Sequence, residues 1–236
     1  MGPSRGKMPR VTTVPTELQS AFDQERVASR SAFERSREPH LLKQATVRMY
    51  GRLAELQARV RDQQKVNIAC EAGCHHCCHL RVEVRPYEAF VLADFIRGEF
   101  SAMSLSEILA KLEANLAKIA PLSPDGHTRA GIPCALLDPH GRCSVYQARP
   151  AACRKYYSTD LATCADARAH PEAPLARDIE HETLRLAGNA VALGFAKGVE
   201  DAGLDAVRVE LHRALVSALK NPKSEKRWRD GKKPFV

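Results

Sequence analysis

Apolar side chains recur at steps of three and four along much of this chain, and that spacing predicts amphipathic helices. In the first third, the recurrence runs from Leu42 to Val60, between many arginine and glutamate residues that would face solvent. Glu38 and Pro39 lie just ahead of it, and the residue before a proline disfavours helical backbone. The pattern therefore predicts a helical hairpin with a break near Pro39.

The middle of the chain predicts another helix, which begins at Pro86 because proline suits the first helical turn. The apolar residues Phe90, Phe95 and Ile96 follow it. These three side chains are expected to point towards the core.

A further helix is predicted over residues 105–119, where apolar side chains again recur at helical spacing. Ser104 and Glu107 fit a capping box at its start, in which each side chain bonds the other residue's backbone N–H. Pro121 cannot continue a helix, so the helix is expected to end before it.

Residues 126–146 predict a loop. Within it, the Asp-Pro-His-Gly sequence at residues 138–141 is a strong turn signal. Pro150 can open a short helix, which would place Cys153 in its first turn.

Two closing helices are predicted after the prolines that follow residue 170. Apolar residues run from Ile179 through Val199 and again from Leu204 to Leu215, and Gly203 marks the break between them. The fold class predicted from these elements is all-α, with a helical bundle around a loop-built, cysteine-rich metal site. One compact domain with a tail is expected. Its regions are an N-terminal helical region (1–66), a cysteine-cluster metal-binding region (67–169), C-terminal helices (170–220) and a basic tail (221–236).

Composition is that of an ordinary globular protein, with 236 residues, 44% hydrophobic and 27% charged. The first fifteen residues lack the apolar core of a secretory signal, and no later run approaches the roughly 18 apolar residues of a membrane span. The sequence is therefore expected to be cytoplasmic, with no membrane partner.

The formal net charge of +8 is concentrated in part at the C-terminus, where lysine and arginine outnumber the acidic residues. Such a tail attracts polyanions weakly. Its aromatic residues, Trp228 and Phe235, form no stacking array, so nucleic acid is not expected as a partner. A solvated, mobile terminus is the simpler interpretation.

Eight cysteines lie between residues 70 and 164, at about 3% of the chain, well below the roughly 8–10% of disulfide-held secreted miniproteins. Short cysteine spacings bring several soft thiolates to one point, as zinc or an iron–sulfur cluster requires. Metal ligation is therefore predicted for all eight, with zinc or iron left open. The predicted ligands are Cys70, Cys74, Cys77 and Cys78 in the first run, and Cys134, Cys143, Cys153 and Cys164 in the second.

Adjacent side chains such as those of Cys77 and Cys78 point in different directions in most backbone conformations. One of the pair can face the core, the two can serve different metal centres, or both can bind separate irons of one cluster. Three nearby histidines are surplus to eight thiols, and hydrogen bonding or exposure is expected for them. They are His75, His76 and His79.

Positive charge lies beside Cys153, where Arg149, Arg154 and Lys155 would offset the negative charge of a thiolate centre. The spacing of the first three cysteines is also that of the radical S-adenosylmethionine cluster loop. Cys78 could fill the iron corner that such enzymes leave open, and the alternating strands and helices of their barrel are absent from the sequence that follows.

Two cysteine motifs of this chain resemble those of the YkgJ-type cysteine-cluster family, the zinc- or iron-chelating CxxCxxCC domain. The first ends in the Cys77-Cys78 pair, and the second joins Cys-Ser-Val-Tyr from Cys143 to Arg-Pro-Ala-Ala-Cys-Arg at residues 149–154. The resemblance covers about residues 67–169. The chain departs from the family name in having three residues, not two, between Cys70 and the next cysteine.

The resemblance implies a zinc or iron centre, and a related cysteine cluster in flagellin lysine methylases implies an iron–sulfur site. The function expected first is a metal-binding protein that serves an unidentified protein partner or a metal-handling pathway. The alternatives are an iron–sulfur enzyme that modifies a protein side chain and a thiol redox protein. The polar residues near the cluster are more simply interpreted as packing groups or as hydrogen-bond partners of the ligands than as catalytic residues; they are Tyr146, Tyr156, Tyr157 and Asp160. Nucleotide-binding loops and hydrolase motifs are absent from the sequence.

Overall fold

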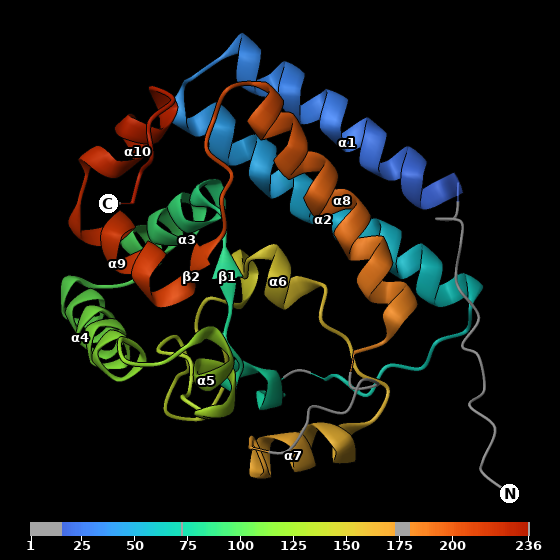
Figure 1. Cartoon of the computed structure of the whole chain (residues 1–236), viewed down its shortest axis with the longest axis vertical. Coiled ribbons are helices and arrows are strands. Elements are labelled where there is room, and N and C mark those ends of the chain that lie inside the picture. The colour runs from blue at the N-terminus through green and yellow to red at the C-terminus, as the bar shows by residue number, and fades with distance from the viewer. Residues whose placement is uncertain (1–15, 72, 173–179, 236) are drawn as a thin grey trace, which may run out of the picture.

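A computed structural model describes residues 16–71, 73–172 and 180–235. These residues form α-helices, two short 3-10 helices and two strands of two residues each, so the predicted all-α class is confirmed (Figure 1). In the first half the elements are α1 (Thr16–Arg35), α2 (Pro39–Gln63), η1 (His76–His79), β1 (Glu83–Val84), α3 (Pro86–Glu99), α4 (Ala102–Ile119) and α5 (Pro124–Arg129). In the second half they are η2 (Tyr146–Ala148), α6 (Ala151–Arg154), α7 (Leu161–Ala169), α8 (Glu182–Asp201), β2 (Val209–Glu210), α9 (Leu211–Lys220) and α10 (Lys223–Arg229).

The predicted N-terminal hairpin is confirmed as α1 and α2, and α8 lies along both of them (Figure 1). Two glycines of α8 allow it to approach α1 very closely. A Cβ atom on Gly198 would lie only 2.3 Å from the carbonyl oxygen of Arg26, and one on Gly194 only 2.3 Å from that of Phe22. The Ser29 hydroxyl uses this proximity to donate a hydrogen bond of 3.0 Å to the carbonyl oxygen of Phe195.

Gly198→Ala is expected to lower the free energy of unfolding by about 1–3 kcal/mol, because the added methyl group can fit only if the helix backbones separate. Gly51 provides a matched control, since it is exposed on α2 and a Cβ there would meet no atom within 4 Å. Gly51→Ala is expected to stabilise the protein by about 0.5–1 kcal/mol through helix propensity. Urea unfolding of both variants measures the difference, and equal effects would contradict this account of the α1–α8 contact.

The predicted helix from Pro86 is confirmed, with the proline in the first turn. Phe90 and Ile96 are buried as expected, whereas Phe95 is only partly buried. The strand β1 directly precedes this helix, and β2 directly precedes α9. The two strands pair antiparallel, and α9 packs on α3. In that pair Val84 lies opposite Val209.

The capping box predicted for the next helix is wrong, because α4 begins one turn earlier. The Ser101 side chain caps it by accepting a hydrogen bond of 3.2 Å from the backbone N–H of Ser104. Two serines three residues apart both suit an N-cap, and nothing between them interrupts a helix. The predicted end before Pro121 is confirmed, since α4 ends at Ile119.

The prediction of a loop from residue 126 is wrong for its first residues, because α5 extends to Arg129. Ser123 caps this short helix by accepting a hydrogen bond of 3.0 Å from the backbone N–H of Gly126. The helix α7 was also not predicted, and the Asp160 carboxylate caps it at the N–H of Ala162. Each of these short helices begins at a single capping side chain and lacks the repeated apolar spacing of the long helices.

The two predicted closing helices correspond to α8 and α9, although their starts differ. Ile179 lies outside the described residues. The second helix starts at Leu211 and not at Leu204, because the intervening residues pass through β2, and Val207 there is 62% exposed. Gly203 breaks the chain as predicted, with a φ of +77° that favours glycine.

The basic C-terminal segment differs from the expected solvated tail, because α10 inserts an aromatic side chain into the core. Trp228 is 1% exposed and its indole N–H donates a hydrogen bond of 2.7 Å to the carbonyl oxygen of Asp205. Its ring lies 5.9 Å from that of Phe33 and 5.6 Å from that of Phe90. Several of the lysines and arginines remain exposed on the other side of this helix. No helix among the described residues is long and apolar enough to cross a membrane.

Candidate metal centre

The first cysteine run forms a turn followed by a short 3-10 helix. Gly73 has a φ of +92°, which permits the turn, and η1 then carries Cys77 and Cys78 on consecutive positions. The backbone N–H of Cys78 donates a hydrogen bond of 2.9 Å to the carbonyl oxygen of His75. All eight cysteines are described, and each is a free thiol.

The second run folds back against the first through a backbone hydrogen bond. The N–H of Cys134 donates to the carbonyl oxygen of Cys78 at 2.8 Å. The chain then turns at the predicted Asp138–Gly141 sequence, where Gly141 has a φ of +76° and its N–H bonds the carbonyl oxygen of Asp138 at 3.0 Å. This turn returns Cys143 to the neighbourhood of Cys134.

The predicted short helix that carries Cys153 is confirmed as α6, with Pro150 as its N-cap. A buried carboxylate holds this helix in place. Glu88 of α3 accepts a hydrogen bond of 2.7 Å from the backbone N–H of Ala151, and the Tyr50 hydroxyl lies 3.3 Å from the same carboxylate oxygen. Burial raises the pKa of Glu88, while its hydrogen bonds oppose that rise.

Both cysteine runs contribute to one cavity of about 640 Å³, which lies within the size range of small-molecule sites. The cysteines that line it are Cys74, Cys77, Cys78, Cys134, Cys143 and Cys153. Cys77 and Cys78 therefore line the same cavity. Thiols from segments more than fifty residues apart meet in this place.

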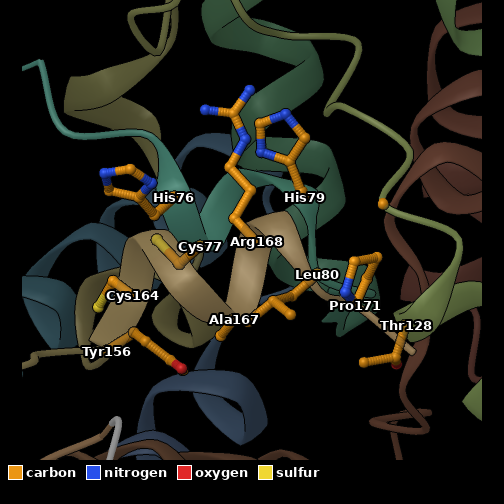
Figure 2. A pocket seen from close by; sticks show the side chains of 11 residues that line it. His76, Cys77, His79, Leu80, Thr128, Tyr156, Cys164, Ala167, Arg168 and Pro171 are labelled. Carbon is orange, nitrogen blue, oxygen red and sulfur yellow. The ribbon is translucent and has the colours of Figure 1, made fainter. Parts of the chain in front are cut away.

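The other two cysteines are brought together by Ser158, which is only 1% exposed. Its backbone N–H donates to the sulfur of Cys70 at 3.3 Å, its hydroxyl donates to the carbonyl oxygen of Asp160 at 3.0 Å, and its side chain lies beside the thiol of Cys164. A small cavity of about 30 Å³ adjoins this group, and both Cys164 and Cys77 line it. Figure 2 shows these two side chains near each other, below His76.

The thiols of the second run carry raised pKa values in the metal-free protein. Burial raises the pKa of Cys134 to about 12 and that of Cys153 well above its usual value. A hydrogen bond from Cys78 and burial together raise the pKa of Cys77. These thiols are therefore neutral at pH 7 without a bound cation, and metal binding would release their protons.

Backbone N–H groups nevertheless lie close enough to two of these sulfurs to stabilise the thiolate form. The backbone N–H of Leu136 bonds the sulfur of Cys134, and that of Val145 bonds the sulfur of Cys143. Each bond opposes the effect of burial on the pKa, because it stabilises the charged form. Donors of this kind are expected around a metal-bound sulfur.

Of the three cations predicted to offset the thiolate charge, Arg149 faces the cysteines. Its guanidinium opposes the rise that burial causes in the pKa of Cys143 and Cys153, and it stacks on the Tyr146 ring at 3.7 Å from the centroid. Arg154 differs from the expectation, since it lies over the Tyr50 ring and donates to backbone carbonyl oxygens. Lys155 also lines the larger cavity, but its ammonium group bonds Asn189.

The three histidines of the first cysteine run differ in their hydrogen-bond environments. The Nε2 atom of His75 lies 2.9 Å from the Arg168 guanidinium, and the Nδ1 atom of His79 lies 3.3 Å from the carbonyl oxygen of His75. His76 has a buried Nδ1 atom without a hydrogen-bond partner among the described residues. Burial lowers the pKa of His76 and of His79, so both favour the neutral form.

A buried polar network that the sequence did not indicate positions the Cys134 segment. The Nδ1 atom of His212 bonds the Glu210 carboxylate at 2.6 Å, and its Nε2 atom accepts from the backbone N–H of Ala135 at 3.4 Å. Asn115 bonds both His212 and the carbonyl oxygen of Pro133, at 3.2 Å and 2.8 Å. This network fixes the residues on either side of Cys134.

As the side chains stand, no group of three or more His, Cys, Asp and Glu in the described parts of the chain is arranged to hold a metal ion. The donor chemistry still fits a soft metal. Six free thiols line one cavity, sulfur-directed N–H groups accompany two of them, and an arginine faces the same space. Rotation of cysteine side chains on metal binding would close such a site, as coupled folding and binding allows.

Residues 69–173 match a protein-family model described as "CxxCxxCC: Putative zinc- or iron-chelating domain". This segment is similar to the CxxCxxCC domain. The family resemblance drawn from the cysteine motifs is thereby confirmed, over nearly the same residues. No curated protein and no solved structure gives a significant match to the chain. The CxxCxxCC domain holds all eight cysteines, whereas Glu210 and His212, which support it, lie outside the matched residues.

Proposed function

We propose that this chain is a metal-binding protein that holds zinc or iron through thiolates of its CxxCxxCC domain. The observation that carries the proposal is the cavity on which six thiols from both cysteine runs meet. Thiolates are the protein ligands that zinc and iron–sulfur clusters share.

The charge around the cavity supports this function. A centre of four thiolates with Zn²⁺, or with an oxidised cubane cluster, carries a charge of about −2. Arg149 supplies a cation at the thiols without an acidic partner among its hydrogen bonds and ion pairs in the described residues. Without metal, the same arginine would face neutral thiols.

A thiol redox switch is less well supported. Redox-sensing cysteines have low pKa values and are accessible, since the thiolate is the reactive form. Burial instead raises the pKa of Cys134, Cys143 and Cys153.

The volume of the larger cavity favours an iron–sulfur enzyme as the second candidate. The cavity extends from the thiols to Tyr156 and Glu180, whose pKa values burial raises. A carboxyl with a raised pKa suits general acid or base catalysis, so a substrate side chain could react beside a cluster. The cluster would supply redox or Lewis-acid chemistry, and Glu180 would accept or donate a proton.

Metal content tests the proposal directly. The full chain, purified without oxygen, is expected to contain zinc, or iron with or without labile sulfide. Cys74→Ser and Cys153→Ser are each expected to lower the bound metal by about half or more, because a tetrahedral site tolerates few ligand losses. His140→Ala is the matched control, since His140 is exposed in the nearby turn and its substitution should leave the metal unchanged.

The same preparation separates the candidates. A brown protein with labile sulfide would favour a cluster and so the enzyme, and a colourless protein with zinc would favour a structural centre. Unchanged metal in both cysteine variants would overturn the assignment. A metal-free protein with eight titratable thiols would support redox chemistry instead.

A further inference from the structure

A further cavity, of about 440 Å³, lies beside the cysteine runs and is lined by positive charge. Its volume is in the range of small-molecule sites. Lys111 and Lys118 of α4 and Arg168 of α7 contribute to its lining. Among the described residues that line it, Asp138 is the one acidic side chain, and Arg142 neutralises it through an ion pair of 3.1 Å. The described lining therefore has an excess of positive charge.

These three cations have no carboxylate within ion-pair distance in the described parts of the chain. On α4 itself, Glu113 pairs with Lys220 at 2.6 Å instead. All three side chains are exposed, so a ligand from solution can reach them. Neighbouring like charges repel one another, and an anion among them would remove that repulsion.

The His75 imidazole holds Arg168 at this cavity. A guanidinium group can only donate, so the Nε2 atom of His75, 2.9 Å away, accepts its hydrogen bond. The ring proton then lies on Nδ1, which is 3.4 Å from the carbonyl oxygen of Gly73. A Cβ atom on Gly141 would lie 3.4 Å from the same ring, so the turn between Cys134 and the next cysteine packs against it. Three separate segments thus place one guanidinium.

The two lysines lie on one face of α4, because seven residues span two helical turns. Their Cα atoms are therefore about 10 Å apart along the helix axis. Asn115 lies between them and also lines the cavity. It is 7% exposed and donates a hydrogen bond of 2.8 Å to the carbonyl oxygen of Pro133, so this face of α4 is held against the second cysteine run.

We propose that this cavity binds a small organic dianion, either a phosphate monoester or a dicarboxylate. Both groups accept charge-assisted hydrogen bonds from guanidinium and ammonium donors, which Arg168, Lys111 and Lys118 supply. Figure 2 shows the Arg168 guanidinium beside the ring of His79, which lines the same cavity. The site goes beyond the proposed function, since its binding groups are cations and not thiols. Cys134 lines this cavity and the larger one, so the two sites are neighbours.

Isothermal titration calorimetry tests this site in the full chain at low ionic strength, where exposed charges are screened least. The probes are glycerol phosphate and succinate, which are both small dianions, and at least one of them is expected to bind. Lys111→Gln and Arg168→Gln should each weaken that binding by about three- to tenfold, because each removes a charge-assisted hydrogen bond. Lys223→Gln is the matched control, since it removes the same charge from an exposed lysine that does not line the cavity. Its Kd should stay within about twofold of the wild-type value.

The probe that binds identifies the anion. Glycerol phosphate alone indicates a phosphate monoester, succinate alone indicates a dicarboxylate, and equal affinity indicates a site that selects by charge. Circular dichroism and metal content are expected to be unchanged in all three variants, which shows that each is folded. No binding of either probe by the wild-type chain, or a loss in Lys223→Gln equal to that in Lys111→Gln and Arg168→Gln, would overturn the proposal. Either result would leave the metal assignment untouched, because metal content is measured separately.

Discussion

Removing the bound metal is expected to open the CxxCxxCC domain to proteases while the layer of α1, α2 and α8 stays folded. Much of the domain between residues 130 and 160 is loop, with only short helices of three and four residues. Structural zinc contributes about 10–16 kcal/mol in small peptides, which is comparable to the net stability of about 5–15 kcal/mol of a whole protein. The loops that carry the thiols therefore depend on the metal far more than the long helices do.

Trypsin provides the measurement, because the domain contains arginines of different exposure. Arg142 is exposed and should be cleaved with or without metal, whereas Arg154 and Lys155 are half-buried. The bond after Arg149 precedes Pro150 and resists trypsin. Treatment with a chelator should increase cleavage after Arg154 and Lys155 by about tenfold or more, since local opening governs proteolysis. Mass spectrometry identifies the sites, and added metal should restore protection.

Two results keep this experiment decisive. Cys153→Ser, which lacks one of the candidate ligands, should show the metal-free pattern before any chelator is added. The same cleavage rate after Arg154 in loaded, chelated and variant protein would mean that the metal does not organise these loops.

The long helices were predictable because each of them repeats its apolar spacing over several turns. Leu42, Met49 and Leu53 of α2 follow that spacing and are all buried. The short helices α5 and α7 contain six and nine residues, too few for a periodic signal to stand out. Single capping residues and tertiary packing determine them instead. The one that carries Cys164, α7, packs on η1 and so places this thiol on the small cavity that Cys77 also lines.

The candidate ligands were predictable from cysteine spacing alone, but their arrangement was not. Spacing cannot show that Ser158 joins Cys70 to Cys164, since a serine with no motif around it carries no signal. Nor can it show that Glu88 anchors α6 through the N–H of Ala151. Both contacts link segments more than sixty residues apart, and only the packing of the helices brings such segments together.

Trp228→Ala is expected to cause the largest loss of stability of any single substitution outside the metal centre. The indole is 1% exposed and contacts the rings of Phe33, Tyr87 and Phe90, which belong to α1 and α3. Truncation of a buried tryptophan costs about 3–5 kcal/mol through lost burial and the cavity that remains. For a chain of this size the melting temperature should fall by about 6–20 °C.

Two further variants separate the roles of the ring and its N–H group. Trp228→Phe retains an aromatic ring but leaves the carbonyl oxygen of Asp205 without its 2.7 Å hydrogen bond, so an intermediate loss is expected. Arg227→Ala changes an exposed side chain on the same helix and should alter stability by less than about 0.5 kcal/mol. Thermal unfolding measures all three. If Trp228→Ala lowered the melting temperature as little as Arg227→Ala, the Trp228 side chain would not stabilise the core, and α10 would be a peripheral helix.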